Sequence, residues 1–199
     1  MNSSLIAEKI LRLYDSVLVS DRAESGCEIQ KLFEENGGIF YRPSLEELAH
    51  LLEQDSAVFE TCGVEESDEI QGAIYGTFDE RISLDNYEGY RESIGNEERR
   101  CFFIGDLIVD PSRKGRGIGS GVLSDLLQAL RIKNEEMLVL AQIYEIISVG
   151  DLECSSLNIP SSIVFKKNGF IDVGSLPPMT KNIGITKITV VPHLFCHEI

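Results

Sequence analysis

The stretch FFIGDLIVDPSRKGRGIGSGVLSDLLQAL, which runs from Phe102 to Leu130, contains the most informative motif of this chain. Its first part is an apolar run that predicts a strand over residues 101–109. Asp110 and Pro111 then begin a glycine-rich turn, and the apolar positions from 118 to 130 recur with the 3.6-residue spacing of a helix. The stretch therefore predicts a strand, a proline turn, a glycine cluster and an amphipathic helix, in that order.

The turn has the features of a phosphate-binding loop. Glycines lack Cβ atoms and let a ligand approach the backbone, and the first turn of the following helix presents unpaired N–H groups and the positive end of the helix dipole. The glycines are Gly115, Gly117 and Gly119. Three cations stand among them, in a chain whose formal net charge is −15: Arg113, Lys114 and Arg116. This concentration of positive charge predicts an anionic ligand at the turn.

Two other phosphate-binding loops are excluded by the residues of the turn. A P-loop requires Lys-Ser or Lys-Thr after its last glycine, and neither pair follows the glycines here. A dinucleotide-binding G-x-G-x-x-G motif fails because Ser120 and Val122 occupy the positions of the third glycine. A generic glycine turn ahead of a helix stays open as the alternative.

The turn resembles the acetyl-CoA loop of the GCN5-related N-acetyltransferase (GNAT) family. The family signature Q/R-x-x-G-x-G/A is similar to KGRGIG at residues 114–119, with Lys in the first position. A second segment, NIPSSIVFKKNGF at residues 158–170, is similar to the family segment N-x-x-[AS]-x-x-x-[FY]-[YF]-x-x-x-G-F. The resemblance implies an α/β fold: a mixed, mostly antiparallel sheet of six or seven strands flanked by helices on both faces. It implies one domain over residues 1–199, with an extra N-terminal helix over 1–14 and the motif region over about 101–174.

The same resemblance implies acetyl-CoA as the acyl donor, with no metal. In the family, backbone N–H groups of the loop bind the pyrophosphate, and the preceding strand pairs its backbone with the pantetheine arm. Asn158 resembles a residue that hydrogen-bonds the pantetheine, and a helix cap before Pro160 is the alternative for it. The binding residues that the resemblance implies are Leu107, Ile108, Val109, Lys114, Gly115, Arg116, Gly117, Ile118, Gly119, Ser120, Asn158 and Phe165.

Two residues are candidates for proton transfer, because acetylation of an amine needs a base for the ammonium and an acid for the leaving thiolate. Asp106 matches the Asp of a Glu-Asp-hydrophobic segment in polyamine-type members, but Gly105 replaces the preceding Glu. A hydrogen-bonded strand residue is the alternative for Asp106. Phe165 stands where many members have a tyrosine acid, so Tyr144 is the candidate donor, with a packed strand tyrosine as its alternative.

These motifs predict an N-acetyltransferase that moves an acetyl group by direct attack onto an amine of a small molecule, a polyamine or a protein. A non-catalytic acyl-CoA-binding or regulatory module of the same fold is the alternative, motivated by Phe165 and Gly105. A homodimer is left open.

The whole chain limits the partners. Its 33 Asp and Glu against 18 Lys and Arg repel phosphate backbones and anionic lipids, which argues against nucleic acid and membranes. Five scattered cysteines without a C-x-x-C pair indicate reduced thiols and a cytoplasmic location. The acids between Glu60 and Glu80 favour cationic acceptors, with a solvated hairpin as the alternative.

The remaining elements follow from periodicity and breakers. We expect helices over 1–14, 24–36, 44–54, 118–130 and 160–167, and strands over 16–20, 57–64, 69–78, 101–109, 137–147, 170–174 and 185–191. Residues 79–100 are expected to form a loop and residues 148–157 an insertion. His193 and His197, with Cys196 between them, have the spacing of a metal pair, but we expect them in a free C-terminal tail and assign no metal.

Overall fold

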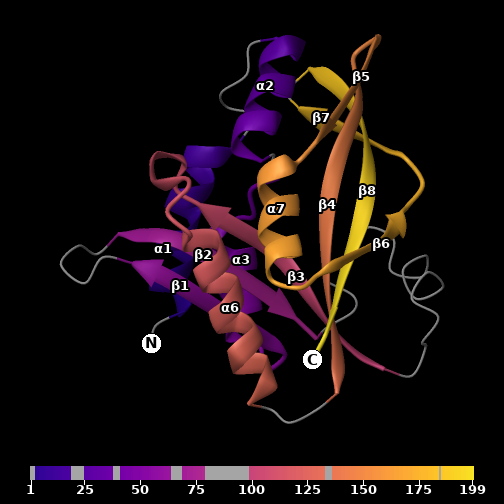
Figure 1. Ribbon diagram of the computed structural model, residues 1–199. Coiled ribbons are helices and arrows are strands. Elements are labelled where there is room, and N and C mark those ends of the chain that lie inside the picture. The colour runs from indigo at the N-terminus through magenta and orange to yellow at the C-terminus, as the bar shows by residue number, and fades with distance from the viewer. Residues whose placement is uncertain are drawn as a thin grey trace.

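The computed structural model describes residues 3–18, 25–37, 41–63, 69–78, 99–132, 136–183 and 185–199. Within these residues, eight strands form one sheet in the order β1-β2-β3-β4-β8-β6, while β5 pairs with β4 and β7 with β8 (Figure 1). The strands are β1 (Ala57–Gly63), β2 (Ile70–Thr77), β3 (Arg100–Val109), β4 (Met137–Val149), β5 (Leu152–Leu157), β6 (Ile171–Ser175), β7 (Met179–Ile183) and β8 (Thr186–Glu198). The β3–β4 pair is parallel and the other described pairs are antiparallel.

Helices cover both faces of this sheet, as Figure 1 shows. The helices are α1 (Ser3–Val17), α2 (Gly26–Asn36), α3 (Leu45–Glu53), the 3₁₀ turn η1 (Pro111–Arg113), α6 (Ile118–Arg131) and α7 (Ile159–Lys167). α6 and α7 lie on one face, and α1 and α3 pack on the other against β2 and β1. The predicted fold class, a mixed and mostly antiparallel sheet flanked by helices, is therefore confirmed, with more strands than the six or seven expected.

α6 holds the glycine turn against the sheet. Its apolar side chains include the fully buried Leu123, Leu126 and Leu130, which pack in one cluster with Val139 of β4 and Phe102 of β3. Burying a leucine side chain contributes about 1.5–3 kcal/mol. The helix predicted over 118–130 is confirmed, and its start is fixed relative to β3.

β3 and β4 separate after Phe103 and Leu140. They pair only from Arg100–Met137 to Phe103–Leu140, after which β4 continues beside β8. Residues 104–109 remain paired with β2 on their other side. Their edge toward β4 therefore has no strand partner in the described part of the chain, which leaves backbone hydrogen-bonding groups for a ligand.

The N-terminal helix is longer than predicted. α1 reaches Val17, so the strand predicted over 16–20 is wrong at its start, and residues 19 and 20 lie outside the described ones. The helix continues because Ile10, Tyr14 and Val17 lie one turn apart on its buried face. α3 begins as predicted, with Ser44 and Glu47 in a capping box.

Two strands were not predicted. Gly150, with φ 59°, turns the chain back, so that the insertion at 148–157 forms β5 against the end of β4. β7 is the second, and it pairs with β8. The prediction of a free C-terminal tail is also wrong, because β8 reaches Glu198 and pairs with β4 over its length. Residues 64–68, between the strands predicted over 57–64 and 69–78, and most of the predicted loop at 79–100 lie outside the described residues.

Candidate functional site

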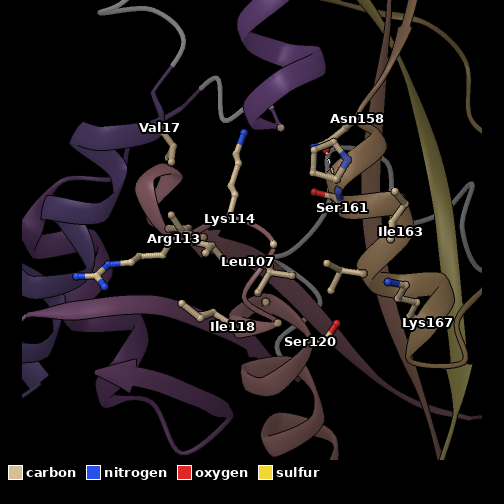
Figure 2. A pocket seen from close by; sticks show the side chains of 18 residues that line it. Val17, Leu107, Arg113, Lys114, Ile118, Ser120, Asn158, Ser161, Ile163 and Lys167 are labelled. Atoms are coloured by element: carbon tan, nitrogen blue, oxygen red, sulfur yellow. Dashed lines mark hydrogen bonds between the residues drawn. The ribbon is translucent and has the colours of Figure 1, made fainter. Parts of the chain in front are cut away.

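A cavity of about 400 Å³ lies where β3 leaves β4. One wall comes from β3 and the start of α6, with Leu107, Ile118 and Ser120, and the facing wall comes from α7, with Asn158 and Ile163 (Figure 2). The predicted residues that line it are Leu107, Ile108, Val109, Lys114, Gly115, Gly117, Ile118, Gly119, Ser120 and Asn158. The structure thus brings the two motifs of the sequence together around one space.

The floor of the cavity is the beginning of α6. Gly117 is the N-cap residue of the helix and has the left-handed conformation, with φ 81°. Because it has no side chain, no capping hydrogen bond occupies the first N–H groups of the helix. Gly115 also has positive φ, at 74°. The first N–H groups of a helix have no acceptor within the helix, so those of α6 are directed toward the cavity mouth together with the positive end of the dipole. This geometry suits a phosphate or pyrophosphate group.

The cavity carries positive charge. Arg113, Lys114 and Lys167 line it, and no Asp or Glu does among the described residues. The Lys114 ammonium extends toward α2, where it donates a hydrogen bond to the backbone carbonyl of Glu35 (Figure 2). Partial burial lowers the pKa of Lys114. Arg116, predicted to bind the ligand, is exposed and does not line this cavity.

Asn158 connects α7, β4 and the end of α2. Its side chain accepts a hydrogen bond from Ser161 N at 3.1 Å, so the helix-cap interpretation is confirmed. Its backbone N–H donates to Tyr144 O at 3.1 Å. It lies 8% exposed at the cavity wall, where a Cβ added to Gly37 would come within 2.9 Å of its Oδ1. Asn158 therefore has a structural role that leaves its contact with a ligand as a prediction.

Phe165 lies in the core instead of at the cavity. It is 3% exposed, and its ring packs edge-on against Phe170 at 5.0 Å. On α7, Ser162 and Phe165 form the buried side, while Pro160, Ile163 and Val164 line the cavity. The structure therefore gives no contact between Phe165 and the cavity.

Asp106 belongs to a partly buried network on the face of β3 that carries α1 and α3. Its Oδ2 accepts hydrogen bonds from Tyr75, at 2.7 Å, and from Tyr14, whose hydroxyl also contacts that of Tyr75. Burial raises the pKa of Asp106, although the two hydroxyls and the positive charge of Lys181 oppose the shift. A Cβ at Gly105 would lie 2.8 Å from the Tyr75 ring, which explains why this chain has glycine where the family pattern has Glu.

Tyr144 does not line the cavity either. Its hydroxyl accepts a hydrogen bond from Lys181 Nζ at 3.2 Å, and the same ammonium lies 4.6 Å from the ring centroid. Lys181 belongs to β7, the strand that sequence reasoning missed, and its charge also reaches Asp106. The sequence carries no signal for this contact, because the two residues are far apart in the chain.

Several lining residues were missed. Val17 and Gly37 come from the ends of α1 and α2, and Lys167 ends α7.

The two C-terminal histidines lie in β8: His193 Nε2 is 3.1 Å from Glu145 Oε2, and His197 Nδ1 is 3.1 Å from Gly169 O. In the part of the chain that is described, no group of three or more His, Cys, Asp or Glu could hold a metal ion, and no helix has the length and apolarity to cross a membrane.

Solved structures share this architecture at low sequence identity. NAA60 of Arabidopsis thaliana, in complex with acetyl-CoA, has a TM-score of 0.54 and 15% identity over 87% of this chain and 93% of that one. The ribosomal-protein-alanine N-acetyltransferase of Brucella melitensis has a TM-score of 0.52 and 16% identity over 96% of this chain and 94% of that one. An aminoglycoside 6'-N-acetyltransferase complexed with coenzyme A has a TM-score of 0.50 and 14% identity over 77% of this chain and 78% of that one. These likenesses concern the fold.

The sequence itself carries the family assignment. No curated protein matches the chain. The family model described as "Acetyltransferase (GNAT) family" matches residues 28–145, which is more than half of the 199 residues. That range includes β3, the glycine turn and β4 as far as Glu145. The chain therefore belongs to the GNAT family of acetyltransferases.

Proposed function

We propose that this protein is an N-acetyltransferase that uses acetyl-CoA bound in the cavity between β3 and α7. The observation that carries the proposal is the meeting of an unpaired strand edge, a helix N-terminus and three cations in one space. The residues present fit the donor. Backbone N–H groups at 117–120 with Lys114 would hold the pyrophosphate, and the apolar edge of Leu107–Val109 would lie along the pantetheine.

Acetyl-CoA, when bound, supplies an acetyl group activated as a thioester. The acceptor ammonium must lose a proton before its nitrogen bonds to the acetyl carbon. The C–S bond then breaks with its electron pair on sulfur, the nitrogen gives up its second proton to solvent, and the thiolate takes up one proton. Asp106 is the proposed base, because its raised pKa makes it a stronger proton acceptor than an ordinary carboxylate. Tyr144 is the proposed acid. Its hydroxyl does not line the cavity, so its proton would reach the sulfur through a water molecule, and the Lys181 ammonium would stabilise the phenolate that remains.

Replacement of Tyr144 by Phe is expected to lower kcat by about 10²-fold, the lower end for one positioned acid. CoA affinity should stay within about twofold, because the side chain does not line the cavity. Steady-state kinetics and calorimetry give the two values. Unchanged kcat would show that Tyr144 is a packed strand tyrosine only.

The matched variant Phe165→Tyr should not raise kcat. Its ring lies in the core beside Phe170, so an added hydroxyl would be buried away from water. This burial would destabilise the fold by about 1–3 kcal/mol. Thermal unfolding and the same kinetics test both statements. A rise in kcat would mean that position 165 faces the reacting sulfur after all.

A non-catalytic acyl-CoA-binding module is the second candidate. One observation favours it: the Asp106 carboxylate is already engaged by two tyrosine hydroxyls. Release of free thiol from acetyl-CoA in the presence of an amine panel supports the enzyme. Tight CoA binding without thiol release for any amine supports the module.

A further inference from the structure

A second cavity, of about 450 Å³, lies on the face of the sheet that carries α3. Its walls are α3 with the residues before it, and β2 with β3. β3 contributes Phe103, Gly105 and Asp106 to this cavity, whereas its next residues, Leu107 to Val109, line the first one. The two cavities therefore adjoin consecutive segments of one strand, at the point where β3 separates from β4.

The two cavities carry opposite charge. The first is lined by Arg113, Lys114 and Lys167 without a carboxylate. The second is lined by Glu47 and Asp106, with His50 as the one basic side chain and no Lys or Arg among the described lining residues. A cavity of one sign concentrates ligands of the other sign. The first suits the phosphates of the donor, and the second suits a cation.

Asp106 is placed to meet an ammonium group beside the donor. It is half-buried, and its Oδ2 is occupied by the two tyrosine hydroxyls while the residue still lines the cavity. A half-buried carboxylate attracts an ammonium more strongly than one in open water, because the surroundings screen less. The reacting nitrogen would therefore lie next to the strand that adjoins the first cavity.

Glu47 supplies a second anionic point at the α3 side. Its Oε2 accepts hydrogen bonds from Ser44 N at 2.7 Å and from the Tyr41 hydroxyl at 3.0 Å, which fix the carboxylate in place. The Ser44 contact lowers the pKa of Glu47, so this residue stays ionised. Tyr41 and Tyr75 also line the cavity, and the exposed Tyr41 ring offers aromatic surface to a cation or to methylene groups.

We propose that this acidic cavity, defined by Tyr41, Glu47, Tyr75 and Asp106, takes the acceptor, and that the acceptor is a small aliphatic amine with a second positive charge. The reacting nitrogen faces Asp106, the second faces Glu47, and the carbon chain lies between them. The volume matches a small molecule, because pockets for such ligands hold about 300–1,000 Å³. This inference rests on the proposed acetyltransferase function.

The test compares putrescine, a diamine, with n-butylamine, which has the same carbon chain and one charge. Thiol release is measured with saturating acetyl-CoA for the wild type, Glu47→Gln and Glu46→Gln. Glutamine at position 47 keeps the capping box, so the helix start is preserved while the charge is removed. Glu46, on the same helix turn, does not line the cavity and provides the control. Calorimetric titration of putrescine into CoA-saturated protein gives a readout that needs no turnover.

We expect the wild type to prefer putrescine over butylamine by about tenfold in kcat/KM, the effect of one charge-assisted contact. Glu47→Gln should reduce this preference to within about twofold and weaken putrescine binding, and Glu46→Gln should change neither. Equal use of both amines, an unaffected Glu47→Gln variant, or better use of a lysine-containing peptide would overturn the inference while leaving the acetyltransferase intact. Absence of CoA binding would instead refute the proposed function, and the inference with it.

Discussion

Asparagine in place of Asp106 is expected to lower kcat/KM by about 10²–10⁴-fold, the range for loss of a positioned base. The variant should fold, because the asparagine carbonyl can still accept the hydrogen bonds that Tyr14 and Tyr75 donate to Oδ2. CoA affinity should stay within about twofold, since Asp106 lies outside the basic cavity. Steady-state kinetics with an accepted amine and calorimetry with CoA measure the two effects.

The pH dependence adds a second test of the same residue. Burial raises the pKa of Asp106, so the carboxyl binds a proton, and stops acting as a base, at a higher pH than an ordinary aspartate. The acid limb of the wild-type kcat/KM profile should therefore lie above the usual carboxyl range, and Asp106→Asn should lack it. The exposed Asp125, which lines neither cavity, gives the control Asp125→Asn. Unchanged kcat/KM in Asp106→Asn would show that this residue is only a hydrogen-bonded strand residue.

The parts of the site that the sequence predicts are those made by neighbours in the chain. The strand over 101–109, the turn and the helix over 118–130 are local, and the glycine spacing, the cations and the helical periodicity are all visible in one stretch. The two motifs predict that Asn158 lies near the turn. In the structure, the end of the strand, the turn, the start of the helix and Asn158 line one cavity, whereas Arg116 and Phe165 do not.

The parts that could not be predicted depend on contacts between distant residues. Tyr14, Tyr75 and Asp106 come from α1, β2 and β3, and nothing local to any of them indicates that their oxygens meet. Lys181 reaches Tyr144 from β7, whose short polar sequence MTKNI gives little strand signal. Such pairings follow from sheet register, which the completed fold determines.

Phe165 shows where a family pattern and local physics diverge. The pattern places this position beside the sulfur, whereas the helical spacing of Ser162 and Phe165 puts both on the buried side of α7. Helical periodicity could have indicated the core position. The strands β5 and β7 are a different case, because their sequences are half-exposed and polar, and each depends on pairing with a long neighbour.

CoA binding at the start of α6 is tested by the Gly117→Val variant. The left-handed φ of 81° at Gly117 costs an L-residue about 1–2 kcal/mol, and the added side chain would stand where the pyrophosphate approaches. Gly121, which follows in the same helix, has open space around it and no positive φ, so Gly121→Val adds the same side chain outside the cavity. Unfolding curves would identify variants that keep the fold, with Gly117→Ala as a milder change.

Isothermal titration calorimetry of CoA against the wild type, Gly117→Val and Gly121→Val gives the required affinities. We expect CoA to bind the wild type, and Gly121→Val to keep this affinity within about threefold. A folded Gly117→Val variant should lose affinity on the order of a hundredfold, since backbone strain and steric exclusion add. Undiminished CoA affinity in a folded Gly117→Val variant would show that CoA does not bind at the start of α6.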